Sequence, residues 1–475
     1  MKTLELSHFR INTLVANWGG LPKSSKPEPA GYPSASLNNA SSILRVFVIS
    51  RRSFLQTGSL AAGVSVALPP LAHAAEVDKS LPPAIAALRT LRGEAKPITI
   101  EERAGRQEKA RVLMRENNLS AILLTPGTSL AYFTGIRWEG GERLFAVVLP
   151  AKGEAFYVSP AFEEGRAREQ IAQSPDGGKP DLRVWQEDES PYARVAQGLS
   201  DRGIASGTVG VEETVKFVFS DNLKKAAASA TFTTATPVTA GCRMIKSRHE
   251  IDLMRLASKV TLAAYEATYR SMKVGMTQRD VEDLLEAAHR KLGFEGGADV
   301  QVGEFSAFPH GSIKPQGIRE GTIVLIDGGC SVEGYASDIT RTFVLGKASD
   351  KMKQVFDIVH RAQSAALSAA KPGMEAGSVD AAARKVITDA GYGPDYKFFT
   401  HRLGHGMGMD GHEWPYLVRG NSTKLQPEMT FSDEPGIYIR GEFGIRLEDD
   451  MHITEGGAEL FTPQSPSLEN PFGKV

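Results

Sequence analysis

The sequence predicts an α+β protein in which a strand-rich carboxyl-terminal domain follows a smaller α/β domain. Between residues 100 and 240, helical and strand patterns alternate, which is typical of an α/β domain. Beyond residue 299 the pattern turns to strands, interrupted by two helical segments, 351–370 and 379–390. At roughly 100–200 residues per domain, a chain of 475 residues has room for both domains and a further segment.

The composition is that of an ordinary globular protein and restricts its chemistry. Lys and Arg number 55 against 56 Asp and Glu, and the resulting net charge of −1 argues against a nucleic-acid binder, which usually presents a strongly basic face. No apolar stretch reaches the roughly 18–20 residues of a membrane span. The two cysteines, Cys242 and Cys330, cannot build a thiolate metal cluster. We therefore expect any metal site to use carboxylates and histidines.

Residues 1–80 are predicted to be an amino-terminal extension that contains an export signal. An arginine pair in residues 50–56 (SRRSFLQ) precedes a short apolar stretch over residues 58–71, and Ala72-His73-Ala74 then forms a cleavage signature. This order of features is typical of a bacterial twin-arginine signal peptide. We expect the mature protein to be periplasmic or secreted, without a stable membrane span.

The α/β domain is predicted to cover residues 81–245. Ala104, Ala110 and Leu113 recur at helical spacing and predict a helix over residues 101–117. A buried strand over residues 121–124 then ends at a Pro-Gly turn. Further strands are predicted over residues 144–149, 155–158, 182–185 and 209–211, and a helix over residues 191–199.

The domain predicted from residue 246 to residue 475 opens with two helices. Ser247 and Glu250 form a capping box, in which a serine is followed three residues later by glutamate, and a long helix continues towards Gly275. Thr277 begins a second helix. The acidic residues and histidines of the chain gather in the strand-rich part that follows.

Four carboxylates and a histidine of this domain predict a metal site. Asp327 ends an apolar strand, and a tight hairpin can bring Asp338 beside it. Glu434 and Glu448 stand at the edges of two later strands. Adjacent carboxylates repel each other, so their convergence requires a cation. If all four converge, two divalent metal ions balance their charge, and His405 adds a nitrogen ligand.

The types of ligand atom also indicate which metal is bound. Oxygen-rich ligation favours manganese, with cobalt, iron and zinc as alternatives. His401 and His405 are four residues apart, but Gly404, Gly406 and Gly408 oppose a helix. On a strand, the two histidines would share a face.

At these residues the sequence resembles the pita-bread metallopeptidases, and within that family the Xaa-Pro branch of prolidases and Xaa-Pro aminopeptidases. The matching segments are IDGG…YASDITRT (Asp327 and Asp338), HRLGHGMG (His405), GHEWP (His412), DEPG (Glu434) and RLED (Glu448). The stretches SAFPHG, GTSLAYFTG and PYLVRGN look most similar to a bacterial prolidase subgroup. The resemblance covers residues 100–470. It implies a pita-bread catalytic domain, of the creatinase and methionine aminopeptidase type, behind a creatinase-like amino-terminal domain.

The resemblance implies how the metals are held. Asp327 would chelate one ion, and Asp338 and Glu448 would bridge the two. His405 and Glu434 would hold the other ion.

It also implies the catalytic groups. Glu434 would take the proton of a hydroxide that bridges the metals and deliver it to the leaving proline nitrogen. His412 would donate to the developing gem-diolate, and His310 would hold the proline side of the substrate. Arg446 would restrain the carboxylates from behind, and His401 would have a similar supporting or structural role.

Three further residues carry specific expectations. Asp433 stands where the family often has asparagine or an apolar residue, and an acid there would raise the pKa of neighbouring carboxylates or pair with a cation. Phe305 and Phe308 are candidates for the apolar wall beside the proline of the substrate.

The implied activity is metal-dependent hydrolysis of the peptide bond between an amino-terminal residue and proline. An Xaa-Pro dipeptidase is favoured, in which Arg446 or an imidazolium would bind the free carboxylate after proline. An Xaa-Pro aminopeptidase that acts on longer peptides is the alternative. A metal-free binding protein or a creatinase-like enzyme of the same fold would lack metal ligands, and methionine aminopeptidases usually lack a full-sized amino-terminal domain. We expect a homodimer whose amino-terminal domain caps the partner's site.

Overall fold

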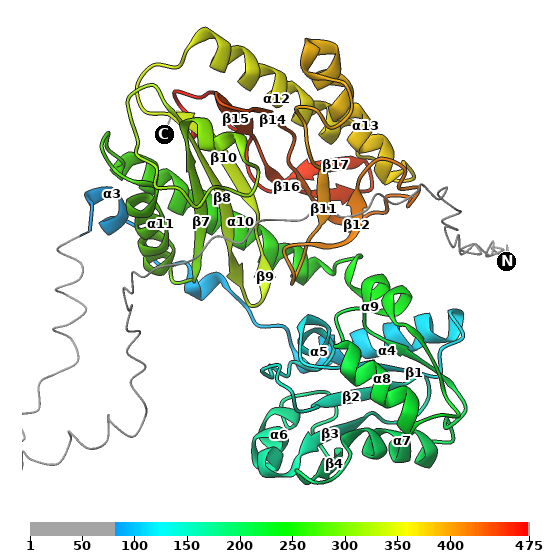
Figure 1. Ribbon diagram of the computed structural model, residues 1–475. Coiled ribbons are helices and arrows are strands. Elements are labelled where there is room, and N and C mark those ends of the chain that lie inside the picture. The colour runs from blue at the N-terminus through cyan, green and yellow to red at the C-terminus, as the bar shows by residue number, and fades with distance from the viewer. Residues whose placement is uncertain (1–80, 474–475) are drawn as a thin grey trace, which may run out of the picture. The chain divides into compact units, whose positions relative to one another are not determined.

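The computed structural model describes residues 81–473 (Figure 1). The predicted extension and export signal, residues 1–80, lie outside the described residues. Among the helices between residues 81 and 473, none combines the length and the apolar character that crossing a membrane requires.

The amino-terminal part is built on a six-stranded mixed sheet with the strand order β4-β3-β2-β1-β5-β6 (Figure 1). Its strands are β1 (Ala121–Leu124), β2 (Ala146–Pro150), β3 (Phe156–Pro160), β4 (Asp181–Trp185), β5 (Thr208–Val211) and β6 (Thr231–Thr234). β1 runs antiparallel to β2 and parallel to β5. All five strands predicted in this domain are therefore confirmed, and β6 was not predicted.

Helices pack on both faces of this sheet. One face shares a core with α4 (Ile100–Glu116), α5 (Thr128–Thr134), α6 (Glu164–Ile171) and α9 (Thr236–Arg243). The other face packs against α7 (Pro191–Asp201) and α8 (Phe217–Ala226). Because β1 is covered from both sides, all four of its residues are apolar and buried. A short helix, α3 (Pro83–Ala86), precedes this domain and packs on α10 (Arg248–Ser271).

The carboxyl-terminal part contains two antiparallel sheets and a separate hairpin. The first sheet has the order β10-β8-β7, with a short strand β9 paired to β8. Its strands are β7 (Gly296–Val302), β8 (Ile323–Val332), β9 (Tyr335–Ala336) and β10 (Ile339–Val344). The second sheet has the order β12-β11-β13-β16-β17. Its strands are β11 (Gly404–Gly406), β12 (Glu413–Leu417), β13 (Thr430–Asp433), β16 (Asp449–Thr454) and β17 (Gly457–Leu460). The hairpin consists of β14 (Gly436–Ile439) and β15 (Phe443–Arg446).

Two pairs of helices cover these sheets (Figure 1). α10 and α11 (Gln278–Leu292) share an apolar core with β7, β8 and β10. α12 (Asp350–Ala369) and α13 (Ala376–Ile387) share one with the second sheet and the hairpin. The predicted capping box of Ser247 and Glu250 is confirmed at the start of α10, where each satisfies the other's backbone N–H. Thr277 caps α11 in the same way.

A buried polar contact joins the amino-terminal domain to the first sheet. The Arg106 guanidinium on α4 donates to the Tyr335 hydroxyl at 2.7 Å, and this hydroxyl donates to Glu250 Oε1 at 2.8 Å. Tyr335 lies on β9, between Asp327 and Asp338 in the chain. The segment that carries two predicted metal ligands is therefore anchored to the other domain.

Candidate metal centre

A cavity of about 230 Å³ lies where the two sheets and the hairpin of the carboxyl-terminal domain meet. Every residue predicted from the sequence as a metal ligand, a catalytic histidine or a supporting residue lines it. The lining residues are Pro309, His310, Asp327, Asp338, His401, Arg402, His405, His412, Glu434, Arg446 and Glu448.

Strand pairing places the first two carboxylates. Asp327 lies within β8, and the residue opposite it on β10 is Thr340. Asp338 precedes β10 and is not the cross-strand partner of Asp327, but the two carboxylates still lie within 4.8 Å of each other. The predicted hairpin therefore forms, with Thr340 in the directly paired position.

The other ligand candidates come from the second sheet. His405 is the central residue of β11, Glu434 follows β13, and Glu448 precedes β16. Gly404 lets β11 approach its neighbour closely, because a Cβ there would collide with the carbonyl oxygen of Ser432. His401 lies before β11, so the expectation that it shares a strand face with His405 is wrong.

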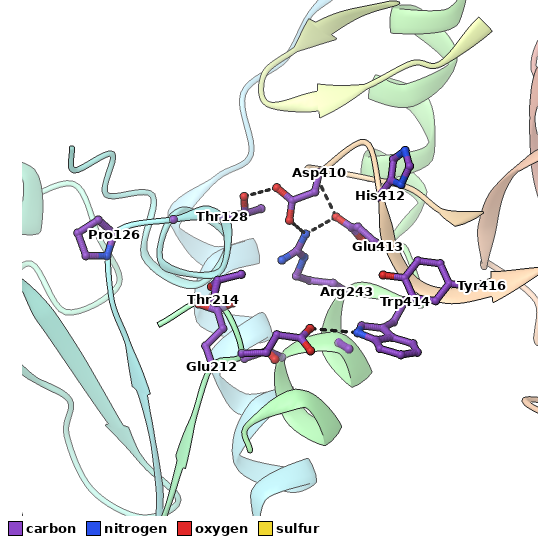
Figure 2. A pocket seen from close by; sticks show the side chains of 14 residues that line it. Pro126, Thr128, Glu212, Thr214, Arg243, Asp410, His412, Glu413, Trp414 and Tyr416 are labelled. Atoms are coloured by element: carbon purple, nitrogen blue, oxygen red, sulfur yellow. Dashed lines mark hydrogen bonds and ion pairs between the residues drawn. The ribbon is translucent and has the colours of Figure 1, made fainter. Parts of the chain in front are cut away.

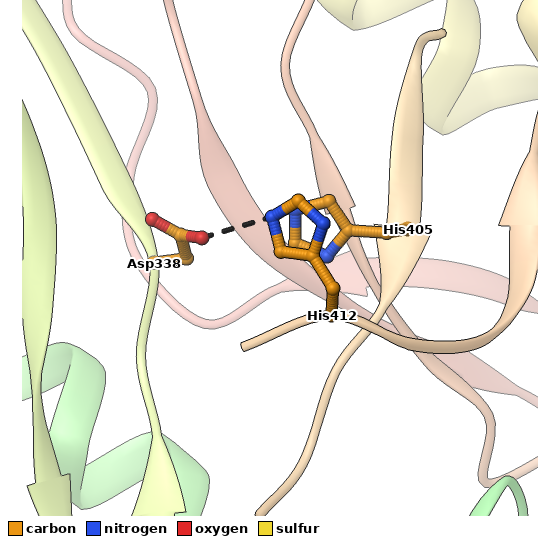
Figure 3. Close-up of side chains that lie close together, drawn as sticks. All are labelled: Asp338, His405 and His412. Atoms are coloured by element: carbon orange, nitrogen blue, oxygen red, sulfur yellow. Dashed lines mark ion pairs between the residues drawn. The ribbon is translucent and has the colours of Figure 1, made fainter. Parts of the chain in front are cut away.

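Three overlapping groups have ligand atoms that all lie within 4.8 Å of one another: Asp327, Asp338 and Glu448; His405, Glu434 and Glu448; and Asp338, His405 and His412. Figure 3 shows the last group, with Asp338 facing the stacked rings of the two histidines. His405 Nε2 lies 3.3 Å from Glu434 Oε1 and 3.8 Å from Asp338 Oδ2. The carboxylates and imidazoles thus surround a common space.

The protonation of His405 fits a metal ligand. Its Nδ1 lies 3.1 Å from the carbonyl oxygen of Gly406, which can only accept, so Nδ1 carries the proton. Nε2 then presents a lone pair towards the carboxylates of Asp338 and Glu434. Because a lone pair and carboxylate oxygens repel each other, this arrangement suits a cation between them.

The electrostatics of the carboxylates point the same way. Burial raises the pKa of Asp338 and Glu448 well above the usual range, and the neighbouring carboxylates raise it further. Burial also acts to raise the pKa of Glu434, but the adjacent His405 imidazole and the Arg446 guanidinium hold it at about 2. Of the cavity's arginines, only Arg446 forms an ion pair with these acids. The donor set of four carboxylates and one imidazole therefore fits two divalent ions.

Arg446 stands behind the carboxylates, as predicted, and is 3% exposed. Its Nη2 bonds Asp327 Oδ2, and its Nε donates to the Thr340 hydroxyl at 3.0 Å. The same hydroxyl lies 2.8 Å from Asp327 Oδ1 and 2.5 Å from Glu448 Oε2. Thr340 was not predicted for the site, although its place opposite Asp327 follows from the hairpin register.

Tyr438 of β14 is a second residue that the sequence did not reveal. Arg446 Nη1 donates to its hydroxyl at 2.8 Å, and the hydroxyl lies 2.7 Å from His401 Nε2. Because His401 Nδ1 donates to the Arg402 carbonyl oxygen at 2.8 Å, Nε2 accepts from Tyr438. His401 is therefore held as a neutral imidazole, with Nδ1 3.7 Å from Glu434 Oε2. Burial lowers the pKa of His401, consistent with that state.

One of the two alternatives for Asp433, pairing with a cation, needs correction, and so does the expectation for Phe305 and Phe308. Asp433 is fully buried, and neither of its carboxylate oxygens has a hydrogen-bond partner between residues 81 and 473, so it pairs with no cation there. Burial raises the pKa of Asp433 well above its usual range, and Asp449 and Glu434 add to the shift. Phe305 and Phe308 are not among the described residues that line the cavity, where Pro309 and His310 stand instead.

A second cavity, of about 460 Å³, adjoins the first and shares His412 with it (Figure 2). Arg243 of α9 reaches across it to Asp410 at 2.5 Å and also bonds Glu413. Trp414 Nε1 donates to Glu213 Oε1 at 3.0 Å. This cavity therefore lies between the amino-terminal domain and the loop that carries His412.

Comparisons with known proteins agree with this site. Residues 106–245 match the Creatinase/Prolidase N-terminal domain, and residues 252–455 match Metallopeptidase family M24. The chain is 33% identical to an Xaa-Pro dipeptidase of Lactobacillus delbrueckii subsp. lactis, over 76% of this chain and 98% of the relative.

Solved structures are also similar. The crystal structure of dipeptidase PepE from Mycobacterium ulcerans matches with a TM-score of 0.74 and 33% identity, over 79% of this chain and 99% of that one. An X-Pro aminopeptidase from Thermotoga maritima matches with a TM-score of 0.62 and 29% identity, over 74% and 97%.

Proposed function

This chain belongs to metallopeptidase family M24, and on that premise we propose that it hydrolyses the peptide bond between an amino-terminal residue and proline. The observation that carries the proposal is the convergence of four carboxylates and His405 on one cavity, which His310 and His412 also line. A binding protein without metals would gain nothing from these carboxylates, whose pKa is raised by burial and then by their mutual repulsion.

In this proposal two divalent ions, preferably manganese, are held by one carboxylate cluster. Asp327, Asp338 and Glu448 would hold one ion, and His405 and Glu434 would join Asp338 and Glu448 in holding the other. When bound, the ions supply Lewis acidity and lower the pKa of bound water to near neutrality. The metal preference is supported by the oxygen-rich donor set.

Three side chains around the cavity would transfer the proton, stabilise the transition state and position the substrate. Glu434 is ionised at neutral pH because neighbouring groups lower its pKa, and as a carboxylate it would accept a proton and pass it to the leaving proline nitrogen. His412, at the exposed end of the cavity, would donate a hydrogen bond to the oxyanion of the transition state. His310, which lines the cavity beside Pro309, would hold the proline ring in place.

The cavity size supports a short substrate. At about 230 Å³, it is smaller than the roughly 300–1,000 Å³ of ordinary ligand sites. We therefore favour an Xaa-Pro dipeptidase and keep an Xaa-Pro aminopeptidase as the alternative, since the adjoining cavity of about 460 Å³ could take a longer peptide.

The experiment is to remove metals from the purified protein, reload it with Mn²⁺, and measure hydrolysis of alanyl-proline and of alanyl-alanine. We expect hydrolysis of alanyl-proline only after loading, with two equivalents of metal bound per chain. The matched control is Glu434→Gln, which keeps the side-chain size and should lose activity. A loaded protein that prefers alanyl-alanine, or that cleaves neither alanyl-proline nor a longer peptide with proline at its second position, would refute the proposal.

The proposal also covers the cellular location of the protein and its oligomeric state. The arginine pair before an apolar stretch and an Ala-x-Ala signature supports twin-arginine export to the periplasm. We also propose a homodimer, in which the amino-terminal domain of one chain limits access to the site of the other. Cell fractionation and light scattering of the purified protein test these two points.

A further inference from the structure

Glu413, the residue that follows His412, is a buried carboxylate held by two cations. Arg243 Nη2, at the end of α9, bonds Glu413 Oε1 (Figure 2). Lys246 Nζ, on the link between the two domains, lies 3.3 Å from Glu413 Oε2. The side chains of Arg243, Lys246 and Glu413 are 12%, 2% and 5% exposed. Water therefore screens these charges little, and they bind one another.

The same groups hold the loop on the other side of His412. Arg243 also bonds the carboxylate of Asp410, and the backbone N–H of Asp410 donates to Glu413 Oε1 at 3.0 Å. Two cations and two carboxylates thus form one charge-balanced group, the Glu413 cluster, which consists of Arg243, Lys246, Asp410 and Glu413. It ties down the loop both before and after His412.

His412 has few contacts of its own. Its side chain is exposed, and its contacts within residues 81–473 are a stack on the His405 ring and Arg402 Nη2 at 3.4 Å from Nδ1. Glu413 begins β12 and is paired with Gly406, the neighbour of His405 on β11. The position of the His412 imidazole therefore depends on how Glu413 fixes the start of this strand.

We propose that the Glu413 cluster positions His412 over the metal cavity, so that the amino-terminal domain controls catalysis through Arg243. The inference rests on the proposed function, because His412 is the hydrogen-bond donor of that reaction. Glu413 and Arg243 line the adjoining cavity and not the catalytic one, so they act as positioning residues.

The backbone of β11 is shaped to admit the cluster. A Cβ at Gly408 would lie 2.9 Å from both Lys246 Cε and Glu413 Oε2, and a Cβ at Gly406 would lie 2.7 Å from the carbonyl oxygen of Glu413. Real side chains do not approach so closely, so glycine at these two positions lets the strand pack directly against the ion pair. The strand that carries His405 thus also accommodates the charges that hold His412.

Stability alone does not explain this arrangement. Burying charges requires their desolvation, and apolar groups of similar volume often stabilise a protein as well as a buried ion pair does. What such a pair adds is direction, because each donor must meet its acceptor in one geometry. Burial acts to raise the pKa of Glu413, but Lys246 and Arg243 lower it below its usual value, so the carboxylate is ionised and attracts both cations.

The first test is Arg243→Lys in the Mn²⁺-loaded protein. The variant keeps the charge but not the planar fork that reaches Asp410 and Glu413 together. We expect kcat for alanyl-proline to fall about 10-fold with the metal content unchanged, because a displacement of about 1 Å can cost up to about 10²-fold in rate. Glu413→Gln, which keeps the shape and removes the charge, should show the same pattern.

A double-mutant cycle with His412→Ala separates positioning from a general structural effect. If Arg243 acts through His412, Arg243→Lys should not lower kcat further once the imidazole is absent. An equal loss in both backgrounds would overturn the inference.

Amide hydrogen exchange of residues 407–414 gives a readout that needs no activity. Exchange should be faster in Arg243→Lys than in the wild type, because the loop loses a contact on each side of His412. Unchanged exchange would also overturn the inference. Absence of Xaa-Pro cleavage in the loaded wild type would instead refute the proposed function, and hydrogen exchange would still test how the loop is held.

Asp181→Asn is the matched control. Asp181 is likewise a carboxylate held by two cations, with Arg183 at 2.8 Å and Arg202 at 2.9 Å, and it lines neither cavity. Its replacement should leave kcat and the exchange of residues 407–414 unchanged. A loss of kcat as large as that of Arg243→Lys would contradict a specific role of the Glu413 cluster.

Discussion

The rings of His405 and His412 stack face to face, with centroids 3.7 Å apart and planes 15° apart (Figure 3). His405 is 1% exposed and holds its proton on Nδ1, whereas His412 is exposed at the cavity mouth. Burial lowers the pKa of His412, and the nearby His405 lowers it further. The two imidazoles therefore occupy different environments, one suited to a ligand and the other to a hydrogen-bond donor.

Replacing His412 tests whether it is a metal ligand or a hydrogen-bond donor to the substrate. In His412→Ala we expect kcat to fall about 10²- to 10³-fold, the usual effect of losing one donor to an oxyanion, while the metal content stays at that of the wild type. Kinetics and metal analysis of the same preparation check both points. A loss of bound metal in the variant would show that His412 is a ligand, as its place within 4.8 Å of Asp338 and His405 allows.

Glu448→Gln should affect metal and activity together. Glu448 shares ligand space with Asp327 and Asp338 on one side and with His405 and Glu434 on the other, so we expect its loss to lower the bound metal to one equivalent or less. Activity should fall by at least about 10³-fold, while the circular dichroism spectrum stays that of the wild type. Near-normal turnover with two equivalents bound would contradict a bridging role.

The metal-free protein should become less stable as the pH rises. The folded-state pKa of Asp338 is raised above its value in the unfolded chain, first by burial and then by Asp327 and other acids. The folded protein therefore holds the proton more tightly, and stability is lost as the pH rises from about 4 through the raised pKa. In the presence of EDTA, we expect Tm to fall between pH 5 and pH 8.

Asp338→Asn is the control for that dependence. The amide does not ionise, so the fall in Tm of the metal-free variant should be clearly smaller than that of the wild type. An equal fall of Tm with pH in the wild type and the variant would show that Asp338 does not cause the pH dependence of stability.

Asp433→Asn should stabilise the protein at alkaline pH only. Burial, followed by Asp449 and Glu434, raises the pKa of Asp433, so ionising it costs roughly 1–3 kcal/mol of stability that the amide avoids. We expect a higher Tm at pH 8 and no change at pH 4.5. The acidic limb of the pH–rate profile should not move, since a protonated Asp433 carries no charge there; a downward shift would show that Asp433 is ionised beside Glu434.

Tyr438→Phe should lower kcat more than it changes KM. The variant leaves Arg446 Nη1 and His401 Nε2 without the hydroxyl that now lies 2.8 Å from one and 2.7 Å from the other. Because Arg446 also bonds Asp327, we expect kcat to fall about 10-fold through a less ordered ligand set. Tyr192→Phe, on α7 of the amino-terminal domain, is the matched control and should leave both constants unchanged.

The sequence alone was sufficient for most of the local elements and for the candidate metal ligands and histidines that line the cavity. Helical spacing, the Ser247 capping box and apolar strands such as residues 121–124 depend on neighbours within a few positions, so they can be read along the chain. The carboxylates and His405 were predictable as a set, because several acids at the edges of apolar strands and a nearby histidine match the motifs of the metallopeptidases that the sequence resembles. All of these residues line the same cavity in the structure.

Tertiary structure decided which side chains support and surround that site. Tyr438 contacts His401, which lies 37 residues away in the chain. The Arg402 guanidinium stacks on Tyr416 and lies beside His412. The burial of Asp433 depends on its strand packing beneath α12. Such contacts come from strand register and from the packing of segments far apart in the chain. No local periodicity encodes them, because many pairings satisfy the same alternation of apolar and polar residues, and only the folded chain selects one.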